Sequence, residues 1–240
     1  MNMDIIFFLC CISFLGGLIH GVTGFGVVLI TLPLMGLFID IKTAIPLILM
    51  LGLVINFTLI SRLIKHIDHK KWTLLFIFSL PGIPLGVYIL KYMDSRYLEL
   101  LIAFVIIFIS FFSMFYTAPA RGPGKKWACL AGSIAGVLGG SIGATGPPVV
   151  IYTSLQPWGK EQIKATMVSF FIVSGLSVLV FYIFNQLITR QVLILFGYSV
   201  LPLLSGVVCG IFIFNRINDI FYKRLINILL VLLGILLLVK

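Results

Sequence analysis

The chain contains few charged residues, and acidic ones are especially scarce. Only 10% of its 240 residues are charged, with 7 Asp or Glu against 17 Lys or Arg. Soluble domains carry about 25% charged residues, so the composition excludes an ordinary soluble protein. With 61% hydrophobic residues and a mean hydropathy of +1.22, we expect an all-α polytopic membrane protein whose working parts lie within the bilayer.

The residue patterns of enzymes and metal sites are also missing. The four cysteines lie inside apolar runs at no metal-binding spacing. No apolar run holds a Ser–His pair with an acid, and neither zinc-type His motifs nor a Walker-type loop occurs. All seven acidic residues lie at or beyond run ends, so no buried carboxylate relay is visible. We therefore expect no cofactor, no metal and no catalysis, and an intramembrane enzyme is the less favoured alternative.

Apolar runs of helical length fill most of the chain. They cover about residues 4–20, 25–39, 43–61, 72–91, 97–117, 127–142, 147–157, 163–185, 191–213 and 220–239. Five runs lie on each side of a Pro- and Gly-containing linker at 117–126. We predict one membrane domain made of two repeats, residues 1–120 and 121–240. The first run follows no basic segment, so it is expected to stay in the membrane.

The two halves align at an offset of 115 residues. Six residues of the first half align with identical residues of the second half. Taken in order, Gly17, Ile19, Gly21, Val22, Gly24 and Pro33 align with Gly132, Ile134, Gly136, Val137, Gly139 and Pro148. Recurrence of this kind predicts a duplication, which is common in transporters.

The net charge of +10 sits in short loops, which is typical of a membrane protein and not of a nucleic-acid partner. The basic loop 62–71 and the linker are expected in the cytoplasm. In the first half the basic loop follows the third run. In the second half the basic loop is 214–224, and it follows the fourth run. The switch predicts inverted repeats in the cell membrane with both termini outside.

Glycine-rich stretches at 16–26 and 132–148 interrupt each half near its beginning. The pieces that follow, 27–38 and 147–157, would span only about 16–18 Å as helices. Each repeat is therefore predicted to hold a glycine-broken or re-entrant helix pair followed by three transmembrane helices. Irregular backbone at membrane depth must face the protein interior or a wet cavity, and helix N-termini there favour an anion.

The glycines divide into two groups. One group fits close helix packing, namely Gly17, Gly21, Gly132 and Gly136. For transport, Gly17→Ala is expected to be milder than Gly24→Val or Gly146→Val, which should abolish it. The other lies at the breaks, where neutral donors accompany the backbone. The predicted binding residues are Thr23, Gly24, Phe25, Gly26, Asn56, Ser141, Gly143, Thr145 and Gly146. No run has Arg or Lys near its centre, so backbone N–H groups are expected to hold the anion.

Three further side chains have two interpretations each. His20 is the only histidine inside an apolar run, and it either exchanges a proton during transport or packs at a helix end. Lys42 and Lys160 follow the two short pieces, where they either gather anions or extend toward the headgroups.

At its two glycine-rich stretches the chain resembles the sulfite exporter family of the TauE/SafE type, also called the 4-toluene sulfonate uptake permease family. The resemblance rests on Gly21, Gly24, Gly26 and Pro33, on the second run closing at 146–148, and on the two related halves, and it covers essentially the whole chain. The second run, Gly143-Ala-Thr-Gly146, is less dense in glycine than the family's usual motif.

The resemblance implies an exporter or permease of small sulfur-containing anions such as sulfite or organosulfonates. Access would alternate around a midplane site at the two glycine-rich breaks. The expected partners are a small anion and membrane lipids, with self-association into a homo-oligomer left open. The runner-up function is an anion channel.

Overall fold

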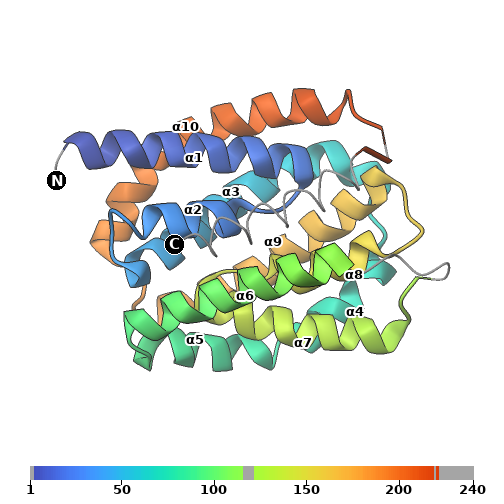
Figure 1. Ribbon diagram of the computed structural model, residues 1–240, viewed down its shortest axis with the longest axis horizontal. Helices are drawn as coiled ribbons and strands as arrows, with labels where there is room; N and C mark the ends of the chain where they lie inside the picture. Colours follow the sequence, from blue (N-terminus) through green and yellow to red (C-terminus); the bar gives the residue numbers. More distant parts are fainter. Residues whose placement is uncertain (1–2, 116–121, 219, 222–240) are drawn as a thin grey trace.

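The computed structural model describes residues 3–115, 122–218 and 220–221, and every regular element within these ranges is a helix (Figure 1). Most of the predicted last run, 220–239, lies outside the described residues. Among the described residues, four helices are long and apolar enough to cross a membrane, and a fifth span results if a bent pair counts as one. The predicted all-helical, multi-pass class is confirmed.

The first half contains six α-helices and one short 3-10 turn. They are α1 (Met3–Thr23), α2 (Val27–Met35), α3 (Ile41–Leu63), η1 (Ile64–His66), α4 (His69–Ser79), α5 (Gly82–Tyr92) and α6 (Ser95–Phe115). Aspartates cap the N-termini of α3 and α4. The carboxylate of Asp40 accepts the backbone N–H of Lys42, and that of Asp68 accepts the backbone N–H of Lys70. Helices α4 and α5 meet at Pro81 with a bend of 49° and form the bent pair.

The second half begins, like the first, with a long, a short and a long helix, and then has one continuous helix where the first half has the bent pair. Its helices are α7 (Lys125–Ile142), α8 (Gly146–Ser154), α9 (Lys160–Phe184) and α10 (Arg190–Phe214). The short helices α2 and α8 have nine residues each, about 13 Å at 1.5 Å per residue. The predicted short pieces after the glycines are therefore confirmed.

Glycine allows three helix pairs to approach closely. Helix α1 lies beside α10, and α7 lies beside α4 and α5 (Figure 1). A Cβ atom at Gly17 would stand 2.2 Å from the carbonyl oxygen of Leu203, and one at Gly136 would stand 2.1 Å from that of Ser79. The nearest backbone oxygen would lie 2.3 Å from a Cβ at Gly132 and 2.7 Å from one at Gly21. The packing role predicted for these four glycines is confirmed.

The repeat offset of 115 is wrong by four residues. Helices α1 and α7 end at Thr23 and Ile142, 119 residues apart, and the next helix begins 119 residues apart at Val27 and Gly146. The error has a physical cause: packing glycines recur every four residues, about one helical turn. Gly17 and Gly21 therefore meet glycines at either offset, but the helix ends agree only at 119.

Candidate functional site

The first break follows α1. Gly24 and Gly26 have φ values of +81° and +97°, a region that suits glycine. The Thr23 hydroxyl caps the turn: it lies 2.8 Å from the carbonyl oxygen of Ile19 and 2.7 Å from that of Phe25, and accepts the Phe25 N–H at 3.3 Å. These contacts fix the path of the chain between α1 and α2.

The second break has the same form at the corresponding position. Gly143 has φ +70° and donates its N–H to the Gly139 carbonyl at 3.1 Å. The Ala144 N–H reaches back to the Leu138 carbonyl at 3.2 Å, a glycine-dependent helix ending. Helix α8 then begins at Gly146.

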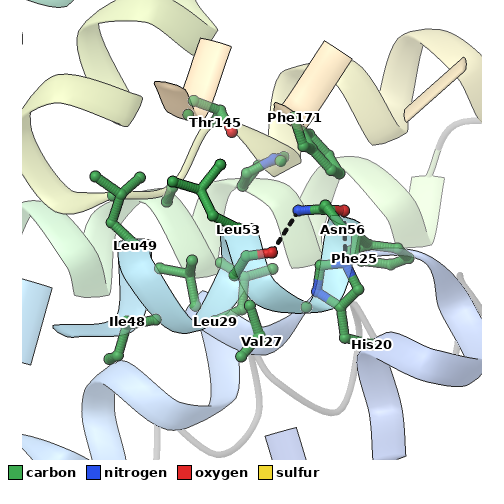
Figure 2. Close-up of a pocket in the computed structure, with 18 residues that line it drawn as sticks. His20, Phe25, Val27, Leu29, Ile48, Leu49, Leu53, Asn56, Thr145 and Phe171 are labelled. Atoms are coloured by element: carbon green, nitrogen blue, oxygen red, sulfur yellow. Dashed lines mark hydrogen bonds between the residues drawn. The ribbon is translucent and has the colours of Figure 1, made fainter. Parts of the chain in front are cut away.

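The two breaks meet at one cavity of about 50 Å³ (Figure 2). At about 10–15 Å³ per water, this space holds a few waters or one small oxyanion. Helices α3 and α9 complete its wall. Seven residues singled out from the sequence line it, namely His20, Phe25, Gly26, Asn56, Gly143, Thr145 and Gly146.

Three other predicted binding residues are not among those that line the cavity. The Thr23 hydroxyl is used in its own turn, and the Ser141 hydroxyl donates to the Val137 carbonyl at 2.8 Å. Gly24 faces α9, where an added Cβ would lie 2.8 Å from Cγ of Lys164. In this conformation these three residues support the breaks through contacts outside the cavity wall.

The two short helices offer the cavity unequal numbers of donors. Residues 27–29 begin α2 and line the cavity, and N–H groups in a first helical turn lack an intrahelical acceptor. The first turn of α8 contains Pro147 and Pro148, which have no N–H. The expectation that both helices direct free N–H groups inward therefore applies to α2 much more than to α8.

A buried histidine and asparagine form the polar wall of the cavity. The Nε2 atom of His20 lies 3.2 Å from Oδ1 of Asn56, and Asn56 donates its Nδ2–H to the Gly52 carbonyl at 2.8 Å (Figure 2). Because Nδ2 is committed as a donor, Oδ1 accepts and Nε2–H donates. Nδ1 of His20 is buried without a partner among the described residues.

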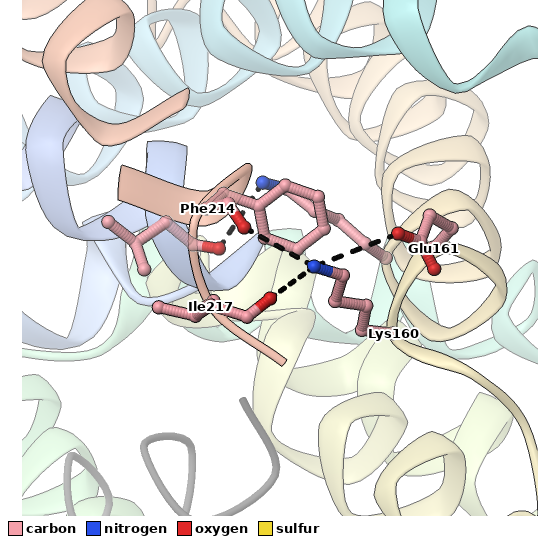
Figure 3. A network of polar contacts seen from close by, with 6 residues as sticks. Lys160, Glu161, Phe214 and Ile217 are labelled. Atoms are coloured by element: carbon pink, nitrogen blue, oxygen red, sulfur yellow. Dashed lines mark hydrogen bonds and ion pairs between the residues drawn. The ribbon is translucent and has the colours of Figure 1, made fainter. Parts of the chain in front are cut away.

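Lys42 and Lys160 lie at helix ends and do not line the cavity. Lys42 Nζ lies 3.5 Å from the carbonyl oxygen of Lys91. Lys160 Nζ donates to the carbonyls of Phe214 and Ile217 and is 3.8 Å from Glu161 (Figure 3). Lys160 thus holds the end of α10 in this conformation.

Sequence reasoning missed Lys164, one turn further along α9. It is 1% exposed, and its Nζ donates to the carbonyls of Gly21 at 2.5 Å and Val22 at 3.2 Å. Position 164 reads as a run end that could reach the headgroups. The one signal in the sequence was its place between the apolar residues Ile163 and Ala165, which are both fully buried in the structure. Within the described ranges, no cluster of His, Cys, Asp or Glu could hold a metal ion.

Long apolar helices around a small cavity define a multi-pass membrane protein. The chain belongs to the sulfite exporter TauE/SafE family, which it matches over residues 9–237, so the predicted family is confirmed. It is also similar to the probable sulfite/organosulfonate exporter TauE of Cupriavidus necator, with 28% identity over 116 residues. That alignment covers 47% of this chain and 45% of the relative. No solved structure matches.

Proposed function

We propose that the protein carries small sulfur-containing oxyanions, such as sulfite or an organosulfonate, across the cell membrane. Both helix breaks meet at one cavity lined mostly by buried residues, with the first turn of α2 in its wall, and this observation carries the proposal. Family membership and the similarity to the Cupriavidus necator exporter support this class of cargo.

The cavity has the chemistry of a site that binds and releases an anion. Backbone N–H groups at 27–29 and the positive end of the α2 dipole attract negative charge. Thr145 and Asn56 add neutral polar groups, and neither Arg nor Lys is among the lining residues. An anion held mainly by backbone donors binds less tightly than one paired with a buried cation, which suits a carrier.

The directions of the broken helices support inverted repeats at 1–120 and 121–240. Gly21, near the end of α1, contacts Lys164 at the beginning of α9, whereas Gly140, near the end of α7, contacts Tyr182 at the end of α9. Helices α1 and α7 therefore approach the cavity from opposite ends of α9. Rocking of one repeat against the other would open the cavity to each side in turn.

Charges and contacts of the loops support the proposed orientation of the chain. Lys71 lies over the ring of Trp158, 4.6 Å from its centroid, and Gln156 donates to the Pro123 carbonyl at 2.9 Å. The basic loop 62–71 thus shares one end of the molecule with the end of the linker, as expected if both are cytoplasmic. We propose that both termini lie outside.

A flux assay with purified protein in vesicles tests the proposal. We expect saturable uptake of radiolabelled sulfite and methanesulfonate, with counterflow when the vesicles are preloaded. Protein-free vesicles and the cation choline serve as controls. Lack of flux for every sulfur oxyanion would reject the cargo class. Single-channel currents without counterflow would instead support an anion channel, the second candidate function, which two breaks around one cavity also allow.

A further inference from the structure

Each helix break frees backbone carbonyls that need a new donor. In an unbroken helix the carbonyls of Gly21 and Val22 would accept the N–H groups of residues 25 and 26. At the first break the Phe25 N–H goes to the Thr23 hydroxyl instead. A buried carbonyl left without a donor is costly in a membrane, so the break requires a cap from another helix.

Helix α9 supplies the cap at both breaks. Lys164 donates to Gly21 and Val22, as described above. At the second break the hydroxyl of Tyr182 donates to the Gly140 carbonyl at 2.9 Å, with Gly139 at 3.4 Å. Gly21 and Gly140 are corresponding positions at the offset of 119. The two donors are 18 residues apart on α9, five helical turns, and share one face.

The two caps differ in charge. Both side chains are essentially fully buried, but Lys164 brings an ammonium group and Tyr182 a neutral phenol. The Lys164 ammonium also lies 3.6 Å from the ring centroid of Phe214, a favourable position for a cation. No described carboxylate lies within ion-pair distance of Lys164. The positive charge is therefore directed at the first break itself.

The charge of Lys164 acts on the side of the cavity formed by the first turn of α2, which has more free N–H donors than α8. Where α1 ends beside the beginning of α2, the carbonyls of α1 present negative partial charge close to the positive end of α2. An ammonium on Gly21 and Val22 offsets that negative charge. The second break has a neutral cap, and its short helix lacks two N–H groups at Pro147 and Pro148.

We propose that the anion is held at the first break, against α2, and that Lys164 is a positioning residue that makes this break electropositive. The inference rests on the proposed function and adds to it that the two halves are unequal in recognition. Lys164 does not need to touch the cargo, because its charge acts through the capped end of α1. Its effect should therefore grow with the charge of the anion.

The test compares Lys164→Met, which keeps the apolar stem and removes the charge, with Tyr182→Phe, which removes the neutral cap. Both are reconstituted in vesicles, and methanesulfonate uptake is inhibited with sulfate, a dianion, and ethanesulfonate, a monoanion. In Lys164→Met we expect KM to rise about tenfold, which corresponds to about 1.4 kcal/mol. The inhibition constant for sulfate should rise more than that for ethanesulfonate.

Tyr182→Phe should leave the ratio of the two inhibition constants within about twofold of the wild type, even if the rate falls. This ratio does not depend on how much protein is folded. Lys164→Arg, which keeps the charge, should restore the ratio even where its larger head slows transport. An unchanged ratio in Lys164→Met, or an equal change in Tyr182→Phe, would overturn the inference. Absence of flux in the wild type would instead reject the proposed function.

Discussion

The imidazole of His20 on α1 and the carboxamide of Asn56 on α3 lie side by side at the cavity, with Nε2 and Oδ1 3.2 Å apart. Because Asn56 is itself held by the Gly52 carbonyl, it fixes the proton of the neutral ring on Nε2. Nδ1 is then the atom that takes up a second proton. A protonated His20 would have a free Nδ1–H donor at the wall of the cavity.

The first prediction concerns pH. Protonation of His20 when the cavity opens to water would add both a charge and a donor, so anion affinity should increase as the pH falls. We expect the KM for methanesulfonate, whose own charge stays constant, to decrease as the pH is lowered. The KM is measured by initial-rate uptake in vesicles with equal pH on both sides.

Variants separate this role from packing. His20→Gln should flatten the pH profile, and Asn56→Leu should weaken it because the ring is no longer oriented. His66→Gln is the matched control, since His66 is exposed in η1. A pH profile in His20→Gln that matches the wild type at normal expression would leave His20 as a packing residue.

The second prediction concerns topology. In a variant without native cysteines, a cysteine at position 66 should resist an impermeant reagent on intact cells, and one at position 240 should react. Position 66 shares the basic end of the molecule with the end of the linker, and position 240 lies outside the described residues. Permeabilised cells are the control and should label both. The reverse pattern would invert the proposed orientation.

Much of the fold could be predicted from the sequence, because run length and glycine position are local properties. The breaks fall where the glycines indicate, at 24–26 and 143–145. The cap by Lys164 could not be predicted, since it joins residues 143 positions apart in the chain. The smaller number of free N–H groups at the beginning of α8, in contrast, could be predicted, because Pro147 and Pro148 have no N–H.

The third prediction concerns the stability cost of Gly17→Ala, which we expect to be milder for transport than valine at the breaks. Alanine there would place Cβ 2.2 Å from the Leu203 carbonyl oxygen, so α1 and α10 must separate. Overpacking of this kind costs about 1–3 kcal/mol, and the Tm in detergent should fall by several degrees. Gly197→Ala on α10 is the matched control, because an added Cβ there meets no atom within 4 Å. Equal Tm values for the two variants would contradict the tight helix contact.

The last prediction separates a fold role from a transport role at the two breaks. Gly24 has φ +81°, and an added Cβ would lie 2.8 Å from Lys164. Gly24→Val should therefore lower both the Tm and the transport rate. Gly146 has an ordinary conformation, and its added Cβ would lie 3.7 Å from Cζ of Phe171, a normal contact.

Gly146→Val should consequently keep the Tm but abolish methanesulfonate uptake, because its methyl groups extend from a position that lines the cavity. Gly146→Ala, with a single added carbon, should keep part of the uptake and serves as the size control. Both quantities are measured on the same preparation, by thermal unfolding in detergent and by uptake in vesicles. Wild-type uptake in a stable Gly146→Val protein would remove the second break from the site, since no anion could then depend on space at that position.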